Sequence, residues 1–212
     1  MTTPPRKTFT PAIIAAIVGL LALAVVTVVV VLNSGDSSDP GTGTEASGSK
    51  DPSSDSSSSN PGDGIASSDD AFTYQLPKGY EEALDKIDTS GAVAAAYAPD
   101  SDKDFATTIV ITSEPAKGTP LDEIVQNGRD AVESSLDTTT DSLTPSMSDI
   151  DGEDVAAYAT GDYDKNGVTL RSAIVVTVHN DTAYAFIVNV KSDKTSDGGD
   201  ALFELINSVT WN

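Results

Sequence analysis

The sequence contains no cysteine among its 212 residues. It therefore forms no disulfide, holds no iron–sulfur cluster or thiolate-bound metal, and offers no thiol for lipid attachment. Histidine is almost as scarce, because His179 is the only one. A Ser-His-Asp triad would have this single candidate base, and no Gly-x-Ser-x-Gly motif accompanies it. We expect His179, which ends a predicted strand beside a predicted turn, to be an exposed loop residue.

Basic residues are also few: 12 lysines and arginines stand against 33 aspartates and glutamates, which gives a formal net charge of −21. Such a surface repels nucleic acid and anionic lipid headgroups, so we expect no nucleic-acid partner. The simplest role of this charge is solubility. Binding of cationic partners is the alternative.

One long apolar run, Ala12 to Leu32, carries no charged residue. As a helix it would measure roughly 31 Å, which matches the hydrocarbon thickness of a bilayer. We therefore predict a transmembrane helix at 12–32 that contacts the lipid bilayer. A cleaved signal peptide is the alternative, since Ala22-Leu23-Ala24 resembles a cleavage site. The apolar run continues past that site to Leu32, which favours an uncleaved anchor.

Charge around this run predicts its orientation. Arg6 and Lys7 precede it, and the next basic residue after it is Lys50. The positive-inside bias places residues 1–11 in the cytoplasm and everything beyond residue 32 outside the cell membrane. Residues 33–70 are dominated by Ser, Gly, Asp and Pro and bury too little apolar area to fold. We predict a disordered linker there, followed by an extracytoplasmic globular domain at 71–212.

Alternating apolar residues and turn signals divide the domain into strands and two helices. Asn166-Gly167 predicts a type I′ hairpin turn, which would place Asp162 opposite Arg171 and Tyr163 opposite Leu170. Asn180-Asp181 predicts a second turn. Helices are predicted from Thr119, as N-cap, with Pro120 as first helical residue, and at about 200–208. Strands are predicted at 72–76, 92–97, 107–113, 143–150, 155–163, 168–179 and 182–190.

Both faces of the predicted central strands are apolar. Ile174, Val176 and Val178 point to one side, and Val175 shares the other side with Phe186 and their neighbours Ala173 and Tyr184. Two apolar faces require a helical layer on each. The sequence thus predicts an α+β fold, an antiparallel β-sheet flanked by helices in an α/β/α sandwich.

The order of these elements, with several signature residues, resembles a known family. The pattern comprises Phe-x-x-x-Leu-Pro-x-Gly-aromatic at 72–80, Gly-Thr-Pro-Leu-Asp at 118–122, Ile-Asp-Gly at 150–152, and Ser-Val-x-Trp at 208–211. It resembles the PsbP-like sandwich, and within it the actinobacterial LpqN/LpqT type of surface lipoprotein domain. The family often has Trp where Tyr80 stands, and its acylated Cys is here replaced by the apolar run. The resemblance implies an extracytoplasmic binding or accessory module without a demonstrated enzymatic activity.

Two acidic segments are candidate metal or catalytic sites. Asp162, Asp164 and Asn166, followed by Gly167, match the opening of an EF-hand calcium loop. The twelfth position of that loop should be Glu and is Ala173, which favours a plain hairpin. Four acids at 149–154 could pair as glycosidase carboxylates, but no substrate cleft is apparent from the sequence. Asn180-Asp181-Thr182 is a formal glycosylation sequon and also a good turn.

Our functional hypothesis is a noncatalytic, membrane-anchored module that binds an envelope protein, glycan or lipid, with no cofactor. The alternative is a small envelope hydrolase or metal-dependent enzyme that uses the acidic loop residues. A structural or sensory ectodomain is the third class. An enzyme should bring carboxylates or His179 together in a pocket, whereas an interaction module need not.

Overall fold

The computed structural model describes residues 64–86, 91–99 and 105–212. The predicted segments 1–11 and 12–32, and most of the predicted linker, lie outside this part of the chain. Within it, no helix is both long and apolar enough to cross a bilayer.

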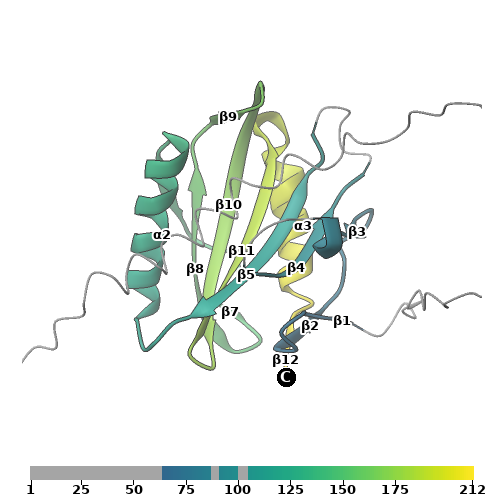
Figure 1. The fold of residues 1–212 in the computed structure, drawn as a ribbon, viewed down its shortest axis with the longest axis vertical. Coiled ribbons are helices and arrows are strands. Elements are labelled where there is room, and N and C mark those ends of the chain that lie inside the picture. Colours follow the sequence, from purple (N-terminus) through teal and green to yellow (C-terminus); the bar gives the residue numbers. More distant parts are fainter. Residues whose placement is uncertain (1–63, 87–90, 100–104) are drawn as a thin grey trace, which may run out of the picture.

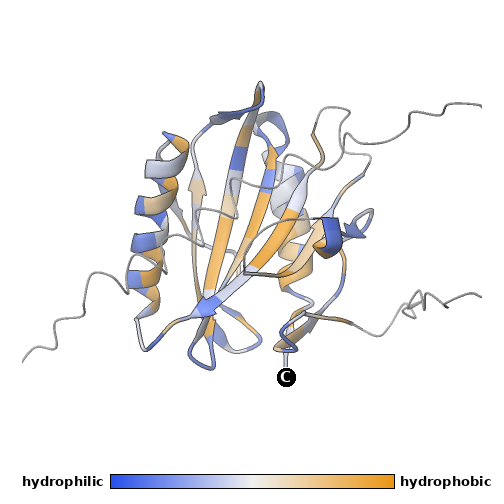
Figure 2. Ribbon diagram, viewed as in Figure 1, coloured by the Kyte–Doolittle hydropathy of each residue, from blue (hydrophilic) through white to orange (hydrophobic). Residues whose placement is uncertain are grey.

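The main sheet is antiparallel and forms the centre of the domain (Figure 1). Its two longest strands, β10 (Val168–His179) and β11 (Thr182–Lys191), lie in the middle of the sheet, and β11 pairs along its full length with β10 from Leu170 onward. In Figure 2 the apolar residues gather along these central strands and β5. The strand order across the sheet is β3 (Glu81–Glu82), β4 (Ala92–Tyr97), β5 (Thr108–Pro115), β11 (Thr182–Lys191), β10 (Val168–His179), β8 (Glu153–Thr160) and β6 (Thr140–Leu143).

Two helices cover opposite faces of this sheet (Figure 1). Helix α2 (Leu121–Leu136) contacts β8, β10 and β6, and helix α3 (Thr195–Ile206) contacts β11. Ile174 and Val176 belong to the core cluster that α2 joins through Ile124, and Val175 belongs to the cluster that α3 joins. The predicted two-sided sheet is thereby confirmed, and the fold is an α+β sandwich with a helix on each face.

Both predicted hairpin turns are present. Asn166 and Gly167 have φ values of 52° and 81°, as a type I′ turn requires, and β9 (Tyr163–Lys165) pairs with the start of β10. Tyr163 lies opposite Leu170, as predicted. Asn180 and its neighbour Asp181 also have positive φ and connect β10 to β11. These turns form because Asn, Asp and Gly tolerate the left-handed region that the turn geometry needs.

Several predicted boundaries are wrong. The N-cap of α2 is Pro120, in extended conformation, rather than Thr119. Helix α3 begins at Thr195, so the two glycines at 198 and 199 are helical, because packing against the sheet overrides their low helix propensity. The single strand predicted at 143–150 is instead two short ones, β6 and β7 (Asp149–Ile150). Short 3-10 helices lie at Leu84–Lys86 and Ser192–Lys194.

A second, smaller sheet joins the two ends of the described chain. It has the order β1 (Ile65–Ala66), β2 (Phe72–Tyr74), β12 (Thr210–Trp211). Residues 64–70, assigned to the linker on composition, are therefore part of the folded domain. Ser67 is buried, and its hydroxyl accepts hydrogen bonds from the amides of Ala71 and Phe72. Backbone pairing between β1 and β2 stabilises this segment, although its composition is polar.

Candidate functional site

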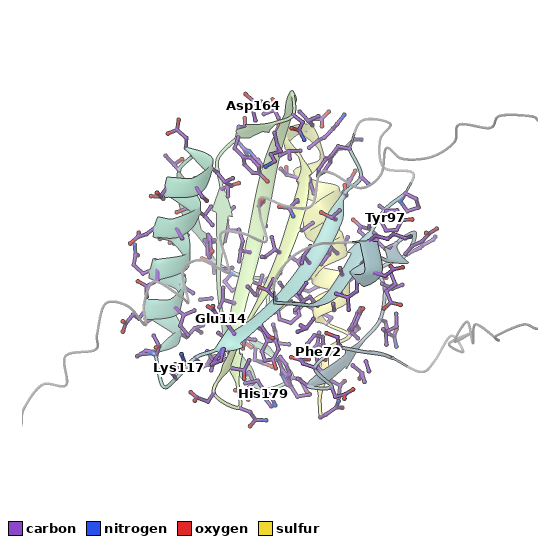
Figure 3. All side chains as sticks on the ribbon, in the orientation of Figure 1. Phe72, Tyr97, Glu114, Lys117, Asp164 and His179 are labelled. Carbon is purple, nitrogen blue, oxygen red and sulfur yellow. The ribbon has the colours of Figure 1, made fainter. Side chains whose placement is uncertain are left out.

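The predicted calcium-loop residues lie on the β9–β10 hairpin, at the end of the sheet far from His179 (Figure 3). The Asp162 carboxylate pairs with the Arg171 guanidinium at 2.5 Å, in the predicted cross-strand position. Asp164 accepts a hydrogen bond from the Thr169 hydroxyl, and Asn166 occupies the turn. Each of these side chains thus has a role in the hairpin. Across the described residues, no group of three or more His, Asp or Glu side chains is arranged to hold a metal ion.

We expect calcium to leave the thermal unfolding of the protein unchanged. A specific site would raise the melting temperature by mass action, but Asp162 would first have to leave Arg171. The measurement is a melting curve of the purified full-length protein with millimolar Ca²⁺ and with Mg²⁺ as the control. A rise specific to calcium, and lost in Asp164→Asn, would restore the EF-hand hypothesis.

Three of the acidic residues at 149–154 have hydrogen-bond partners within the fold. Asp149 accepts a hydrogen bond from the Gly152 amide within the β7–β8 turn, and its pKa is held low by the Ser148 hydroxyl and that amide. The Asp151 carboxylate accepts a hydrogen bond from the backbone of Trp211. Glu153 contacts His179. Hydrogen bonds of Asp149, Asp151 and Glu153 therefore stabilise the β7–β8 turn and join it to Trp211 and His179.

His179 is not the exposed loop residue that the sequence predicts. It ends β10, its side chain is 15% exposed, and its ring stacks on the Trp211 indole with a centroid separation of 4.4 Å. Its Nδ1 lies 2.8 Å from Glu153 Oε1, and its Nε2 lies 2.8 Å from the Asn180 side-chain nitrogen. The stacking partner is distant in sequence, so no local pattern indicates this contact.

The hydrogen bonds of His179 define its chemistry. In the neutral tautomer Nδ1–H donates to the Glu153 carboxylate, and Nε2 accepts from the Asn180 amide. A carboxylate–histidine pair of this kind also orients the base of hydrolases. Here an amide stands where a nucleophilic hydroxyl would be needed. Both ring nitrogens are thus used within the fold, and the pair serves to position the ring against Trp211.

Trp211 is the centre of an aromatic cluster that joins the two sheets. Phe72 meets the indole edge-on at 5.4 Å, and Tyr184 lies at 5.0 Å. The indole Nε1–H donates to the Ile150 carbonyl at 2.9 Å. The Tyr184 hydroxyl also donates a hydrogen bond to Asp69. Burial, and to a smaller extent the Asp69 carboxylate, raise the pKa of the Tyr184 hydroxyl to about 12. The cluster holds the small sheet against the main sheet. Because the small sheet contains both ends of the described chain, these ends are held in place as well.

Glu114 is a candidate that the sequence analysis missed. It lies near the end of β5, directly opposite Ala183 of β11, and is only 8% exposed. By this register it faces the α2 side, whereas His179 stacks on the opposite side at the same end of the sheet (Figure 3). Its Oε1 is one of two buried side-chain oxygens that have no hydrogen-bond partner in the described part of the protein, the other being the Tyr158 hydroxyl.

The environment of Glu114 opposes its ionisation. Burial raises its pKa from the ordinary 4.5 to about 7, and the Lys117 ammonium lowers it only partly. Strand alternation, if extended one residue beyond the predicted end at 113, would have placed Glu114 on the same inward face as Val110 and Thr112. Its burial depends on β11, however, which lies far along the sequence.

Glu114→Gln should stabilise the protein at high pH and not at low pH. A carboxyl whose pKa is raised on folding contributes most below pH 4.5, and that contribution is lost as the pH rises to about 7. After allowing for solvent screening, we expect the variant to gain about 1 to 2 kcal/mol at pH 8 and nothing at pH 4. Urea unfolding at both pH values measures this, and an equal gain at both would contradict it.

Comparisons with known proteins place the fold among distant structural neighbours. No family model matches the chain, and no curated protein matches its sequence. Among solved structures, LpqN of Mycobacterium tuberculosis, involved in cell envelope biogenesis, is 15% identical with a TM-score of 0.45, over 66% of this chain and 82% of its own. Cyanobacterial PsbP from Synechocystis is 16% identical with a TM-score of 0.44, over 74% and 99% of the two chains.

Proposed function

We propose that this protein is a noncatalytic binding module of the cell envelope, anchored by residues 12–32 and displayed outside the membrane on the linker. The observation that favours binding over catalysis is the arrangement of His179, whose two nitrogens contact Glu153 and Asn180 and whose ring lies against Trp211. The one histidine is thereby part of the scaffold. The ligand is proposed to be a protein, glycan or lipid of the envelope.

The anchored arrangement is testable because the chain has no native cysteine. Ser57→Cys introduces a thiol into the linker, and Thr8→Cys introduces one before the apolar run. We expect a membrane-impermeant maleimide to label the first variant on intact cells and the second only after lysis. Labelling of Thr8→Cys on intact cells would contradict the orientation. Recovery of the Ser57→Cys protein in the soluble fraction would contradict the anchor.

Ligand binding is tested with the full-length protein immobilised in neutral detergent through an N-terminal tag. Fractionated envelope extract is passed over it, and retained components are compared with those held by the heat-unfolded protein. We expect at least one protein, glycan or lipid to be retained by the folded form alone. Equal retention by both forms would contradict the proposal.

An envelope hydrolase is the second candidate, and one observation favours it. The pKa of about 7 at Glu114 is that of a general acid working near neutral pH. Asp151 and Glu153 are hydrogen-bonded to Trp211 and His179, and Glu114 Oε1 has no hydrogen-bond partner in the described part of the chain. Turnover of an envelope glycan or lipid by the purified protein, abolished in Glu114→Gln, would replace the binding proposal with this one.

A further inference from the structure

The carboxyl group of Glu114 lies among small, buried neighbours. Ala183 lies opposite it, Thr112 precedes it on the same face, and Ala116 follows it; all three are buried. Leaving a buried charged acceptor without a hydrogen-bond donor costs free energy, about 1 to 3 kcal/mol or more. The cost is offset if a hydrogen-bond donor from another molecule binds the Glu114 carboxylate.

The nearest basic residue does not satisfy this carboxylate. Lys117 is exposed in the loop after β5, with φ of 52°, and no ion pair joins it to Glu114. Its influence is a longer-range attraction that only partly offsets the effect of burial. Lys117 is therefore a competitor for a bound cation rather than the partner of Glu114.

Acidic groups surround the same loop. The backbone of Ala116 and Gly118 is hydrogen-bonded to Asp181 of the β10–β11 turn, which brings this exposed acid beside the loop. The first turn of α2, immediately after the loop, carries exposed Asp122 and Glu123. Together with the chain's net charge of −21, these acids would attract a basic partner and raise its rate of association.

We propose that Glu114 is the recognition group of a site that receives a cationic side chain, lysine or arginine, from a basic polypeptide partner. A metal ion fits the site less well, because calcium takes six to eight oxygen ligands and Glu114 supplies a single carboxylate. An anionic lipid headgroup would be repelled. The inference rests on the proposed binding function and specifies the chemistry of one contact within it.

The test uses n-butylammonium as a lysine side-chain analogue, with n-butanol as the uncharged control. Backbone amide chemical shifts of residues 112–114 and 116–118 are followed in the full-length protein in neutral detergent at pH 8. We expect saturable shifts with the cation and none with the alcohol. Glu114→Gln should abolish them, and Lys117→Gln should strengthen binding a few-fold by removing the competing charge. Glu123→Gln, which changes charge on the rim only, should retain saturable binding.

Each remaining outcome counts against the site. Shifts that never saturate, or that are as large in Glu114→Gln as in the wild type, would overturn it. So would identical responses to the cation and the alcohol. If the immobilised protein still retains an envelope component equally well after Glu114→Gln, the cationic contact is wrong while the binding function stands.

Discussion

Trp211→Ala is expected to lower the free energy of unfolding by about 3 kcal/mol. The indole contacts Phe72, Tyr184 and His179, and its Nε1–H donates to Ile150. Trp211 is half-buried, and its truncation removes the aromatic contacts and leaves the Ile150 carbonyl without its donor. Because Trp211 also pairs with Phe72 across β12 and β2, the C-terminal strand should detach.

The measurement is urea unfolding of the full-length protein, with Phe203→Ala as the matched control. Phe203 is also a large apolar residue near the C-terminus, but it is 42% exposed on α3. Its truncation should cost less than about 1 kcal/mol. Hydrogen exchange should also show faster exchange at β12 and β2 in the Trp211 variant. Equal losses of stability in the two variants would show that the aromatic cluster does not hold the sheets together.

Gly198→Ala is expected to destabilise the protein by about 2 kcal/mol, although alanine is the better helix former. A methyl group at this position would lie 2.1 Å from Cγ1 of Val190 and 3.3 Å from Cγ2 of Val188. Valine is branched at Cβ, so it has little freedom to turn aside. Helix α3 would have to move away from β11, which is the strand that it contacts most.

The adjacent glycine provides the control. Gly199 is exposed on the same helix, and a methyl group there meets no atom within 4 Å. Gly199→Ala should therefore stabilise the protein by up to about 1 kcal/mol through helix propensity alone. Adding Val190→Ala to Gly198→Ala should recover part of the lost stability, a coupling that a double-mutant cycle detects. Destabilisation by both single glycine variants would contradict close packing as the cause.

The stability predictions and the binding proposal meet at Glu114. Glu114→Gln is expected to be more stable than the wild type at pH 8 and unable to bind the cation. A group that weakens the fold while contributing to binding is the usual compromise at functional sites. Gain of stability without loss of binding would assign the carboxylate no role in recognition.

The sequence alone determined the features that depend on neighbouring residues. Alternating apolar side chains placed Ile174 and Val175 on opposite faces of β10, and Asn166-Gly167 set the hairpin register that pairs Asp162 with Arg171. These features follow from the two-residue period of a strand and from turns that require positive φ, both of which are local. The α/β/α arrangement followed because two apolar faces need two covering layers.

Only the tertiary structure decided the features that depend on distant pairing. The ring of His179 lies on Trp211, residues 64–70 join the fold through β2, and Glu114 is buried against β11. Local sequence patterns predicted an exposed loop position for His179 and a linker for residues 64–70, and they gave no indication for Glu114. The structure differs at these positions because contacts between segments that are distant in sequence outweigh local conformational preference.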